Sequence, residues 1–361
     1  MDMTPTDLIL DGRRVSREEV QSVSPEDLEA MPRHLADLFA FLTEWHSPSD
    51  TVTVTTSGST GKPKTMQAEK RRMIASAVRT CDFLGLKPGD KALLCMDLRY
   101  IGAKMMVVRS IVRGLDLVVV PPSGNPLRGV DADIDFAAFV PMQLYNMMQD
   151  GGQQAKLRRV RRIIIGGGAV SPALESRVDA LDGEVYSTYG MTETLSHVAM
   201  RRLGAWGDGR YHPLGGVSLT LSPDRTLVID APDVCGTRLV TNDLAEIAPD
   251  GSFVIIGRKD NVINSGGVKI IPEQVETALH KHLGCPLALT SVPDAKFGEA
   301  AVLLLAADGI DRIGLYEAVQ ALPPYHRPKH VVLVDSIPLT PNGKVARGEC
   351  RRIAECRVRT S

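Results

Sequence analysis

Residues 51–64 read TVTVTTSGSTGKPK, in which alternating threonine and valine lead into a loop of glycine, serine and threonine with two lysines. Alternation of β-branched residues predicts a strand over Thr51–Thr56. A glycine-rich loop directly after a strand lets backbone N–H groups and hydroxyls approach phosphate oxygens, and its lysines add positive charge. The stretch therefore predicts a phosphate-binding loop. Taken alone, it is also compatible with a flexible serine–glycine turn.

The main rival interpretation is a Walker A loop, which the spacing excludes. That motif requires glycine five residues before Gly61 and serine or threonine directly after Lys62. This chain has Thr56 and Pro63 at those positions. An unrelated P-loop nucleoside triphosphatase is therefore disfavoured.

Downstream of the loop, short β-rich runs alternate with longer helical patterns. Such alternation predicts βαβ units and a mostly parallel sheet covered by helices. Besides Thr51–Thr56, strands are expected at Ala92–Met96, Leu117–Val120, Phe136–Val140, Ile163–Ile165 and Val185–Thr188, and helices at Glu69–Leu84, Tyr100–Arg113 and Pro172–Leu181.

After residue 210 the sequence pattern changes. Thr226–Ile229 and Phe253–Ile256 are strand-like and lie beside the turn signals Ser-Pro-Asp and Pro-Asp-Gly, which predicts hairpins in a smaller β-rich subdomain. A boundary is expected near Arg258, which gives a domain of residues 1–258 and an α+β domain of residues 259–361. In the second domain, helices are expected at Glu273–Leu283, at Arg312–Ala321 and after Lys344.

The composition excludes several classes of protein. Among 361 residues, Lys plus Arg is 42 and Asp plus Glu is 43, so there is no general attraction to nucleic acid or to an anionic membrane. The six cysteines form no CxxC pair, which disfavours a zinc site and favours the reduced thiols of a cytoplasmic protein. We expect no signal peptide and no membrane span. Nothing indicates a homo-oligomer.

Five further motifs follow the loop in order. They are Gly166–Gly168, YGMTET at 189–194, TNDL at 241–244, GRKDNVINSGGVK at 257–269 and PLTPNGK at 338–344. Each motif alone is a weak signal. In this order, they resemble the motifs of the adenylate-forming enzymes, which include acyl- and aryl-CoA synthetases, luciferases and peptide-synthetase adenylation domains. The resemblance extends over residues 51 to 350.

The resemblance implies ATP, Mg²⁺, coenzyme A and a small carboxylic acid as ligands, and it assigns roles to matching residues. Thr192 would touch the α-phosphate, and Glu193 would hold Mg²⁺. The β- and γ-phosphates would bind to the loop residues Thr56, Ser57, Gly58, Ser59, Thr60, Gly61, Lys62 and Lys64. Adenine would pack against Gly166, Gly167, Gly168, Ser187, Thr188, Tyr189 and Gly190.

The second half of the chain carries the remaining implied roles. Asp243 would accept hydrogen bonds from the ribose hydroxyls, with Arg258 close by. Asp260 matches the hinge between the domains, and Gly266 and Gly267 match the lining of the coenzyme A tunnel. Lys344 matches the catalytic lysine that contacts the carboxylate and the α-phosphate, which makes it the third catalytic residue with Thr192 and Glu193.

The residue types fit the chemistry of carboxylate activation. A carboxylate is a poor acyl donor until its attack on the α-phosphate makes an acyl-AMP mixed anhydride. The attacking carboxylate and the phosphates repel each other, so a lysine and Mg²⁺ are needed to offset charge in the transition state.

The chain departs from the family pattern in three places. The glycine-rich loop begins at residue 56, which predicts an α/β fold of layered sheets with a truncated N-terminal subdomain, a β-rich subdomain and a small mobile α+β C-terminal domain. Asn242 stands where the family has glycine. Arg99 and Tyr100 replace an aromatic residue and a histidine at the acyl pocket. Cationic or donor groups for the substrate are therefore expected from Arg99, Tyr100, Lys104 and His197.

The identity of the acid depends on a narrower resemblance. Segments such as LRYIGAKMM at 98–106 and YGMTETLSH at 189–197 are similar to those of short 2-succinylbenzoate–CoA ligases of menaquinone biosynthesis. A ligase for another aryl or medium-chain acid is the first alternative. A non-catalytic adenylate-binding module is the second, which the presence of Lys344, Glu193, Asp243 and Arg258 disfavours.

Overall fold

A computed structural model gives the fold and describes residues 7–55, 65–306, 311–340 and 344–359. The chain divides into two compact units. The first consists of residues 1–219, 229–239 and 250–252, and the second of residues 220–228, 240–249 and 253–361.

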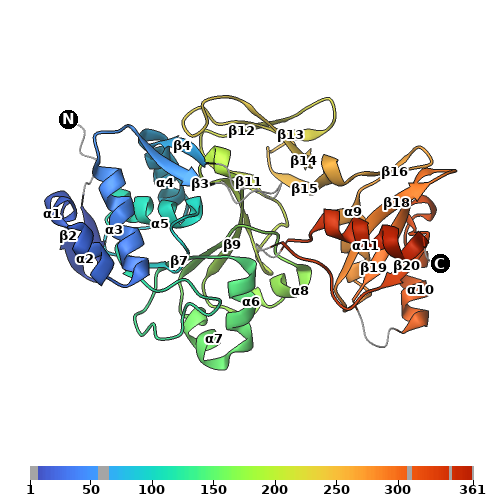
Figure 1. Cartoon of the computed structure of the whole chain (residues 1–361), viewed down its shortest axis with the longest axis horizontal. Helices are drawn as coiled ribbons and strands as arrows, with labels where there is room; N and C mark the ends of the chain where they lie inside the picture. Colours follow the sequence, from blue (N-terminus) through green and yellow to red (C-terminus); the bar gives the residue numbers. More distant parts are fainter. Residues whose placement is uncertain (1–6, 56–64, 307–310, 341–343, 360–361) are drawn as a thin grey trace. The chain divides into compact units, whose positions relative to one another are not determined.

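A nine-stranded sheet forms the centre of the first unit, in the order β11-β10-β9-β8-β7-β5-β6-β1-β2 (Figure 1). Strands β1 and β5 to β9 pair in parallel, whereas β2, β10 and β11 pair antiparallel to their neighbours. The mostly parallel sheet expected from the sequence is thereby confirmed. Its strands are β1 (Leu8–Leu10), β2 (Arg13–Val15), β5 (Lys91–Leu94), β6 (Asp116–Val119), β7 (Phe136–Phe139), β8 (Arg162–Ile165), β9 (Glu184–Gly190), β10 (His197–Arg202) and β11 (His212–Pro213).

Helices bury both faces of this sheet (Figure 1). Ala92 and Leu94 belong to a core shared with α3 (Arg33–His46), α4 (Lys70–Phe83) and α5 (Ile101–Arg113). Leu93 belongs to the other core, together with α6 (Pro141–Gln149), α7 (Gly151–Arg158) and α8 (Pro172–Glu175). Successive side chains of a strand point to opposite faces, so a strand buried on both faces reads as a continuous apolar run.

The strand Thr51–Thr55, β3, differs from the expectation because it is not part of the large sheet. It pairs antiparallel with β4 (Thr65–Glu69) in a separate two-stranded sheet on either side of the glycine-rich segment. Two short helices, α1 (Arg17–Ser22) and α2 (Pro25–Ala30), precede α3. The helix expected over Pro172–Leu181 is also shorter: α8 ends at Glu175, and a 3₁₀ turn follows at Val178–Ala180.

A four-stranded sheet of β12 (Ser218–Leu221), β13 (Thr226–Asp230), β14 (Leu239–Ile247) and β15 (Phe253–Arg258) matches the expected β-rich subdomain. It is followed by a five-stranded sheet of β16 (Ile263–Ser265), β17 (Val268–Ile270), β18 (Leu287–Asp294), β19 (Gly298–Leu305) and β20 (His330–Leu333). Alternate residues of β18 and β19 pack against α9 (Pro272–His280) and α10 (Arg312–Gln320) on one face and α11 (Arg347–Arg359) on the other.

Among the residues that the structure describes, no helix has the length and apolar character needed to cross a membrane.

Candidate active site

The carboxyl ends of β8 and β9 bring two of the predicted nucleotide-binding segments together. Ile165 pairs with Ser187 at the end of these parallel strands, so Gly166–Gly168 emerges beside Thr188. The Thr188 hydroxyl donates to the Ile165 carbonyl at 3.1 Å. A Cβ on Gly166 would lie 3.0 Å from that hydroxyl oxygen, so glycine is what permits the close approach. Ligands of parallel α/β sheets usually bind at this edge.

A tight turn after β9 presents the two predicted catalytic side chains of the first unit. Gly190 pairs with His197 of β10, and a Cβ on Gly190 would lie 2.2 Å from the Ser196 carbonyl oxygen. Thr192 and Glu193 occupy the 3₁₀ turn Thr192–Thr194, where Glu193 is exposed. Leu195 closes the turn at φ 63°, a conformation that is uncommon for leucine and recurs at functional sites.

The Glu193 carboxylate fits the proposed magnesium role in chemical type. Mg²⁺ is usually held by one or two carboxylates together with substrate phosphates and water. Within residues 7–55, 65–306, 311–340 and 344–359, no group of three or more His, Cys, Asp or Glu side chains gathers in a metal-binding arrangement. A magnesium ion at Glu193 would therefore depend on the nucleotide for its other ligands.

Directly behind this turn lies a buried cation that the sequence analysis missed. Arg109 of α5 is 1% exposed, and its guanidinium donates to the Ser196 hydroxyl at 2.8 Å. In the part of the chain that the structure describes, no ion pair joins Arg109 to a carboxylate, and its Nε has no hydrogen-bond partner. Burial lowers the pKa of Arg109 to about 10, so the group remains positively charged at neutral pH.

His197 completes this buried cluster. It is 7% exposed; its Nε2 lies 2.9 Å from the Thr80 hydroxyl, and its Nδ1 lies 3.2 Å from the Ser196 hydroxyl. Burial, together with the charge of Arg109, holds the pKa of His197 well below its usual value. The imidazole is therefore neutral at physiological pH. The partly exposed Ser196 hydroxyl lies between a fixed positive charge and a neutral ring.

The other residues expected at the substrate pocket have separate partners. Arg99 is exposed and pairs with Asp97 at 2.6 Å. Tyr100 forms a backbone bridge with Thr55 of β3, and Lys104 donates to the Thr53 carbonyl at 2.8 Å. Among the described residues, Arg99, Lys104 and His197 share no hydrogen-bond or ion-pair partner. Their assignment to the substrate pocket stays a prediction.

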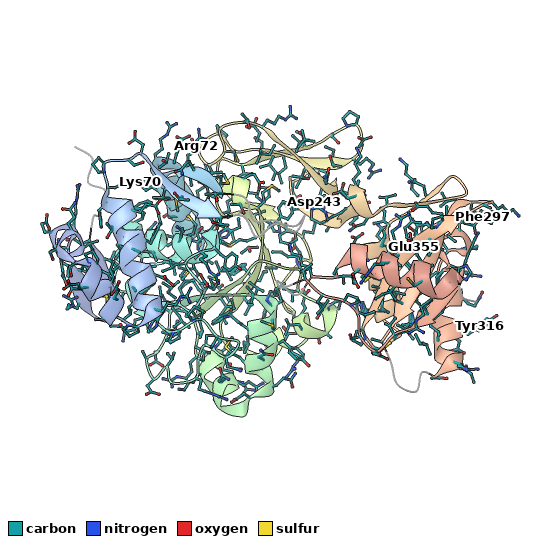
Figure 2. The ribbon with its side chains drawn as sticks, viewed as in Figure 1. Lys70, Arg72, Asp243, Phe297, Tyr316 and Glu355 are labelled. Atoms are coloured by element: carbon teal, nitrogen blue, oxygen red, sulfur yellow. The ribbon has the colours of Figure 1, made fainter. Side chains whose placement is uncertain are left out.

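The second unit carries a cluster around Asp243, which lies on β14 (Figure 2). Arg258, its cross-strand neighbour on β15, donates to Asp243 at 2.8 Å and to Asp260 at 3.1 Å. The Asn242 amide donates to the same oxygen of Asp260 at 3.1 Å. The asparagine that replaces the family's glycine therefore contacts the predicted hinge residue.

The predicted coenzyme A tunnel and catalytic lysine lie further along the second unit. Gly266 (φ 59°) and Gly267 (φ 82°) form the turn between β16 and β17. A Cβ on Gly266 would lie 2.7 Å from the Phe297 ring, whereas one on Gly267 would meet nothing within 4 Å. Lys344 is exposed, and its backbone forms reciprocal hydrogen bonds with Thr340 just before α11. The predicted phosphate-binding residues Thr56–Lys64 lie outside the described residues.

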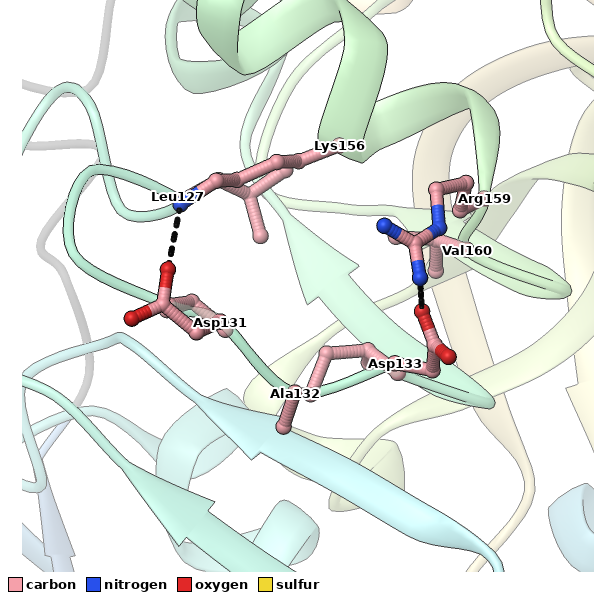
Figure 3. A pocket seen from close by; sticks show the side chains of 9 residues that line it. Leu127, Asp131, Ala132, Asp133, Lys156, Arg159 and Val160 are labelled. Carbon is pink, nitrogen blue, oxygen red and sulfur yellow. Dashed lines mark hydrogen bonds and ion pairs between the residues drawn. The ribbon is translucent and has the colours of Figure 1, made fainter.

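A surface pocket between residues 127–134 and α7 contains none of these residues (Figure 3). Two exposed ion pairs cross it: Lys156 with Asp131 at 3.3 Å, and Arg159 with Asp133. Exposed pairs of this kind contribute at most about 1 kcal/mol to stability. We assign the pocket no role in the site.

Comparison with known proteins shows the family. The family described as "AMP-binding enzyme" matches residues 3–234. A crystal structure of an acyl-CoA synthetase (AMP-forming)/AMP-acid ligase II-like protein from Dyadobacter fermentans is 33% identical, with a TM-score of 0.62, and the match covers 91% of this chain and 97% of that one. The chain belongs to the AMP-binding enzyme family. Within that family it is an AMP-forming acid–thiol ligase.

Two further relatives carry a named substrate. A 2-succinylbenzoate–CoA ligase of Bacillus cereus is 27% identical over 358 residues, which cover 88% of this chain and 73% of that protein. The o-succinylbenzoate CoA synthetase of Bacillus subtilis, solved with its acyl-adenylate intermediate, is 22% identical with a TM-score of 0.70 over 82% of this chain and 68% of that one. Another structure of the Bacillus subtilis enzyme holds ATP and a magnesium ion, and this chain matches it at 22% identity and a TM-score of 0.68 over 82% and 69% of the two chains.

Proposed function

We propose that the chain is a Mg²⁺-dependent ligase that activates 2-succinylbenzoate with ATP and transfers the acyl group to coenzyme A. The observation that carries the choice of acid is the buried guanidinium of Arg109 behind the Thr192–Leu195 turn, with no carboxylate paired to it among the described residues. The names of the relatives support the same acid.

The substrate has two carboxylates, and only one of them reacts. The carboxylate on the succinyl arm attacks the α-phosphorus of ATP, and pyrophosphate leaves. The thiolate of coenzyme A then attacks the acyl carbon, and AMP leaves with the electrons of the acyl C–O bond. The carboxylate on the aromatic ring stays ionised throughout, and a buried ion without a partner would be costly.

The Arg109 cluster offers the ring carboxylate a partner. The Ser196 hydroxyl accepts a hydrogen bond from Arg109 and lies 3.2 Å from the His197 Nδ1. A carboxylate bound on the accessible side of Ser196 would receive the hydroxyl proton in place of that ring nitrogen. The positive charge behind it strengthens that donation, because the cluster is buried and water screens it little. A ligand carboxylate at Ser196 would thus be paired with a charge that the protein otherwise leaves uncompensated.

The residues of the sequence motifs would act on the reacting groups. Thr192 would donate to the α-phosphate, Glu193 would hold the magnesium ion that neutralises phosphate charge, and Lys344 would bridge the attacking carboxylate and the α-phosphate. Asp243 would bind the ribose hydroxyls. After adenylation, residues 259–361 would rotate about Asp260, so that Gly266 and Gly267 replace Lys344 beside the adenylate.

A thioester assay over three acids tests the proposed substrate. Each acid is supplied with ATP, Mg²⁺ and coenzyme A, and the acyl-CoA product is measured. We expect strong preference for 2-succinylbenzoate over 4-phenyl-4-oxobutanoate, which lacks the ring carboxylate, and over benzoate. Equal turnover of the diacid and the 4-phenyl-4-oxobutanoate monoacid would contradict the dicarboxylate proposal and favour a ligase for simpler aryl acids.

A further inference from the structure

Lys104 and Glu44 lie against the strand that leads into the glycine-rich segment. Among the described residues, β4 is the one strand that pairs with β3, so the backbone groups on the other edge of β3 need different partners. In a two-stranded antiparallel ribbon, alternate residues direct both their N–H and their C=O away from the paired strand. On β3 these residues are Thr51, Thr53 and Thr55.

Each outward-facing threonine has a partner of a different kind. Thr51 exchanges hydrogen bonds with the Ser49 hydroxyl at 3.0 and 3.1 Å. Thr55, the last described residue before the glycine-rich segment, forms a parallel backbone bridge with Tyr100. At Thr53, midway along the strand, side chains from two helices take the place of a neighbouring strand.

An ion pair supplies both partners of Thr53. Its N–H donates to Glu44 Oε1 of α3 at 2.6 Å, and its carbonyl accepts from Lys104 Nζ of α5 at 2.8 Å. The two side chains are paired with each other at 3.8 Å. Lys104 is 9% exposed and lies 4.9 Å from the centre of the Phe41 ring, so its charge acts with little screening.

We infer that the Glu44–Lys104 pair positions the phosphate-binding loop by holding β3 at Thr53, and that Lys104 acts on ATP binding and not on the acid. The inference rests on the proposed function, in which the segment after β3 binds the β- and γ-phosphates. Val52 and Val54 are fully buried in the core on either side of Thr53, so the strand has little freedom while the pair is intact. Loss of either partner leaves a backbone group of Thr53 unpaired and frees the strand three residues before Thr56.

The affinities for ATP and AMP separate this role from a general loss of stability. AMP lacks the β- and γ-phosphates, so only ATP binding depends on the loop. In calorimetry with Mg²⁺, Lys104→Met should weaken ATP binding by about three- to tenfold, because loop groups displaced by a fraction of an ångström lose much of their contribution. AMP binding should change by less than about twofold, within the scatter expected for an untouched subsite. In pyrophosphate exchange the KM for ATP should rise while the KM for the acid stays constant.

Two further variants complete the test. Glu44→Gln keeps an oxygen that can accept from Thr53 but removes the charge that pairs with Lys104, so an intermediate loss of ATP affinity is expected. Lys70→Met is the matched control (Figure 2): Lys70 Nζ also donates to a backbone carbonyl, that of Ser47 at 2.9 Å, but Ser47 precedes β3. Lys70→Met should leave the ratio of ATP to AMP affinity unchanged.

Three results would overturn the inference. The first is an equal loss of ATP and AMP affinity in Lys104→Met. The second is a fall in the ratio of ATP to AMP affinity in Lys70→Met as large as that in Lys104→Met. The third is a rise in the KM for the acid alone, which would place Lys104 in the acid pocket. If one of these three results were found while the wild-type protein still catalysed acid-dependent pyrophosphate exchange, the inference about Lys104 would fail and the proposed function would stand. If wild-type protein bound no ATP, both would fail.

Discussion

Arg109 shows how a residue with a proposed function can be concealed by its surroundings. It lies within MMVVRSIV at 105–112, a run that reads as the buried face of a helix, and most of its neighbours there are core residues. The family motifs lie in loops and do not include Arg109, although a lone arginine inside an apolar helical run is itself a signal. His197 was named from the sequence as a pocket residue, but the hydrogen bond from Arg109 to Ser196 joins positions 87 residues apart and could only come from the fold.

The first prediction concerns Arg109→Met. Loss of the cation should raise the KM for 2-succinylbenzoate by at least about 30-fold, the equivalent of about 2 kcal/mol. The KM for 4-phenyl-4-oxobutanoate should hardly change, because that acid has no ring carboxylate. The melting temperature should stay the same or rise, since replacing buried charge with an apolar side chain is often neutral or stabilising. Kinetics with both acids and thermal unfolding check these outcomes.

A matched change separates charge from shape at this position. Arg109→Lys keeps a positive charge but loses the planar group that reaches Ser196, so it should recover part of the preference for the diacid. If Arg109→Met weakened both acids equally and lowered the melting temperature, Arg109 would be a structural residue of α5 and would not recognise substrate.

Lys344 gives the second prediction at the residue scale. Lys344→Ala should slow acyl-AMP formation by at least about 10²–10³-fold, the scale for losing one charge-stabilising group in a transition state. Thioester formation from supplied acyl-AMP should continue, because the α-phosphate bond is already made. The two half-reactions are measured by pyrophosphate exchange and by thioester release. A parallel loss in both would mean that Lys344 is not specific to adenylation.

At the scale of elements, sequence patterns predicted where strands begin and end but not which strands pair. The parallel strands β5 to β8 were placed within one or two residues of their observed ends, because apolar runs buried on both faces are a strong local signal. The pairing of β1 with β6 was not foreseen, since it joins Leu10 to Leu117. The separate β3–β4 sheet was missed for the same reason: alternation identifies a strand but not its partner.

The turn between β16 and β17 gives the third prediction. Gly267→Leu should reduce thioester formation far more than adenylation, because the new side chain would enter the space proposed for coenzyme A. That space is open in the second unit, since a Cβ on Gly267 meets nothing within 4 Å. The same side chain at Gly266 would collide with Phe297, so a change there would not be informative. The two half-reactions are again measured separately.

Gly251→Leu controls for backbone strain in that experiment. Gly251 lies in the turn between β14 and β15 at φ 84°, close to the 82° of Gly267, and a Cβ there also meets nothing within 4 Å. Both variants should lose a similar, small amount of stability from the left-handed conformation, about 1 kcal/mol. Only Gly267→Leu should change the ratio of the half-reactions. An equal change in both variants would assign the effect to strain.

At the scale of the whole molecule, the proposed catalytic groups are divided between the two units. Thr192 and Glu193 belong to the first unit, whereas Asp243 and Lys344 belong to the second. In the proposed mechanism, adenylation needs the lysine and the second step needs access for a thiol. Both needs would be served by moving one part of the chain. Within the second unit, the proposed hinge Asp260 lies in sequence between Asp243 and Lys344, so a change there tests the proposed rotation of residues 259–361.

Asp260→Pro should separate the two half-reactions. Asp260 occupies the 3₁₀ turn Lys259–Asn261. The φ values typical of 3₁₀ turns, about −50 to −70°, include the −65° that proline enforces, so the variant should fold. Rotation about this residue would be restricted, and one half-reaction should be retained while the other falls. Asp260→Ala is the matched control, because it also removes the contacts with Asn242 and Arg258 but leaves φ free. If the two variants behaved alike, the contacts of the carboxylate would matter and rotation at residue 260 would not. An unequal loss confined to Asp260→Pro is the result that the two-state hinge requires.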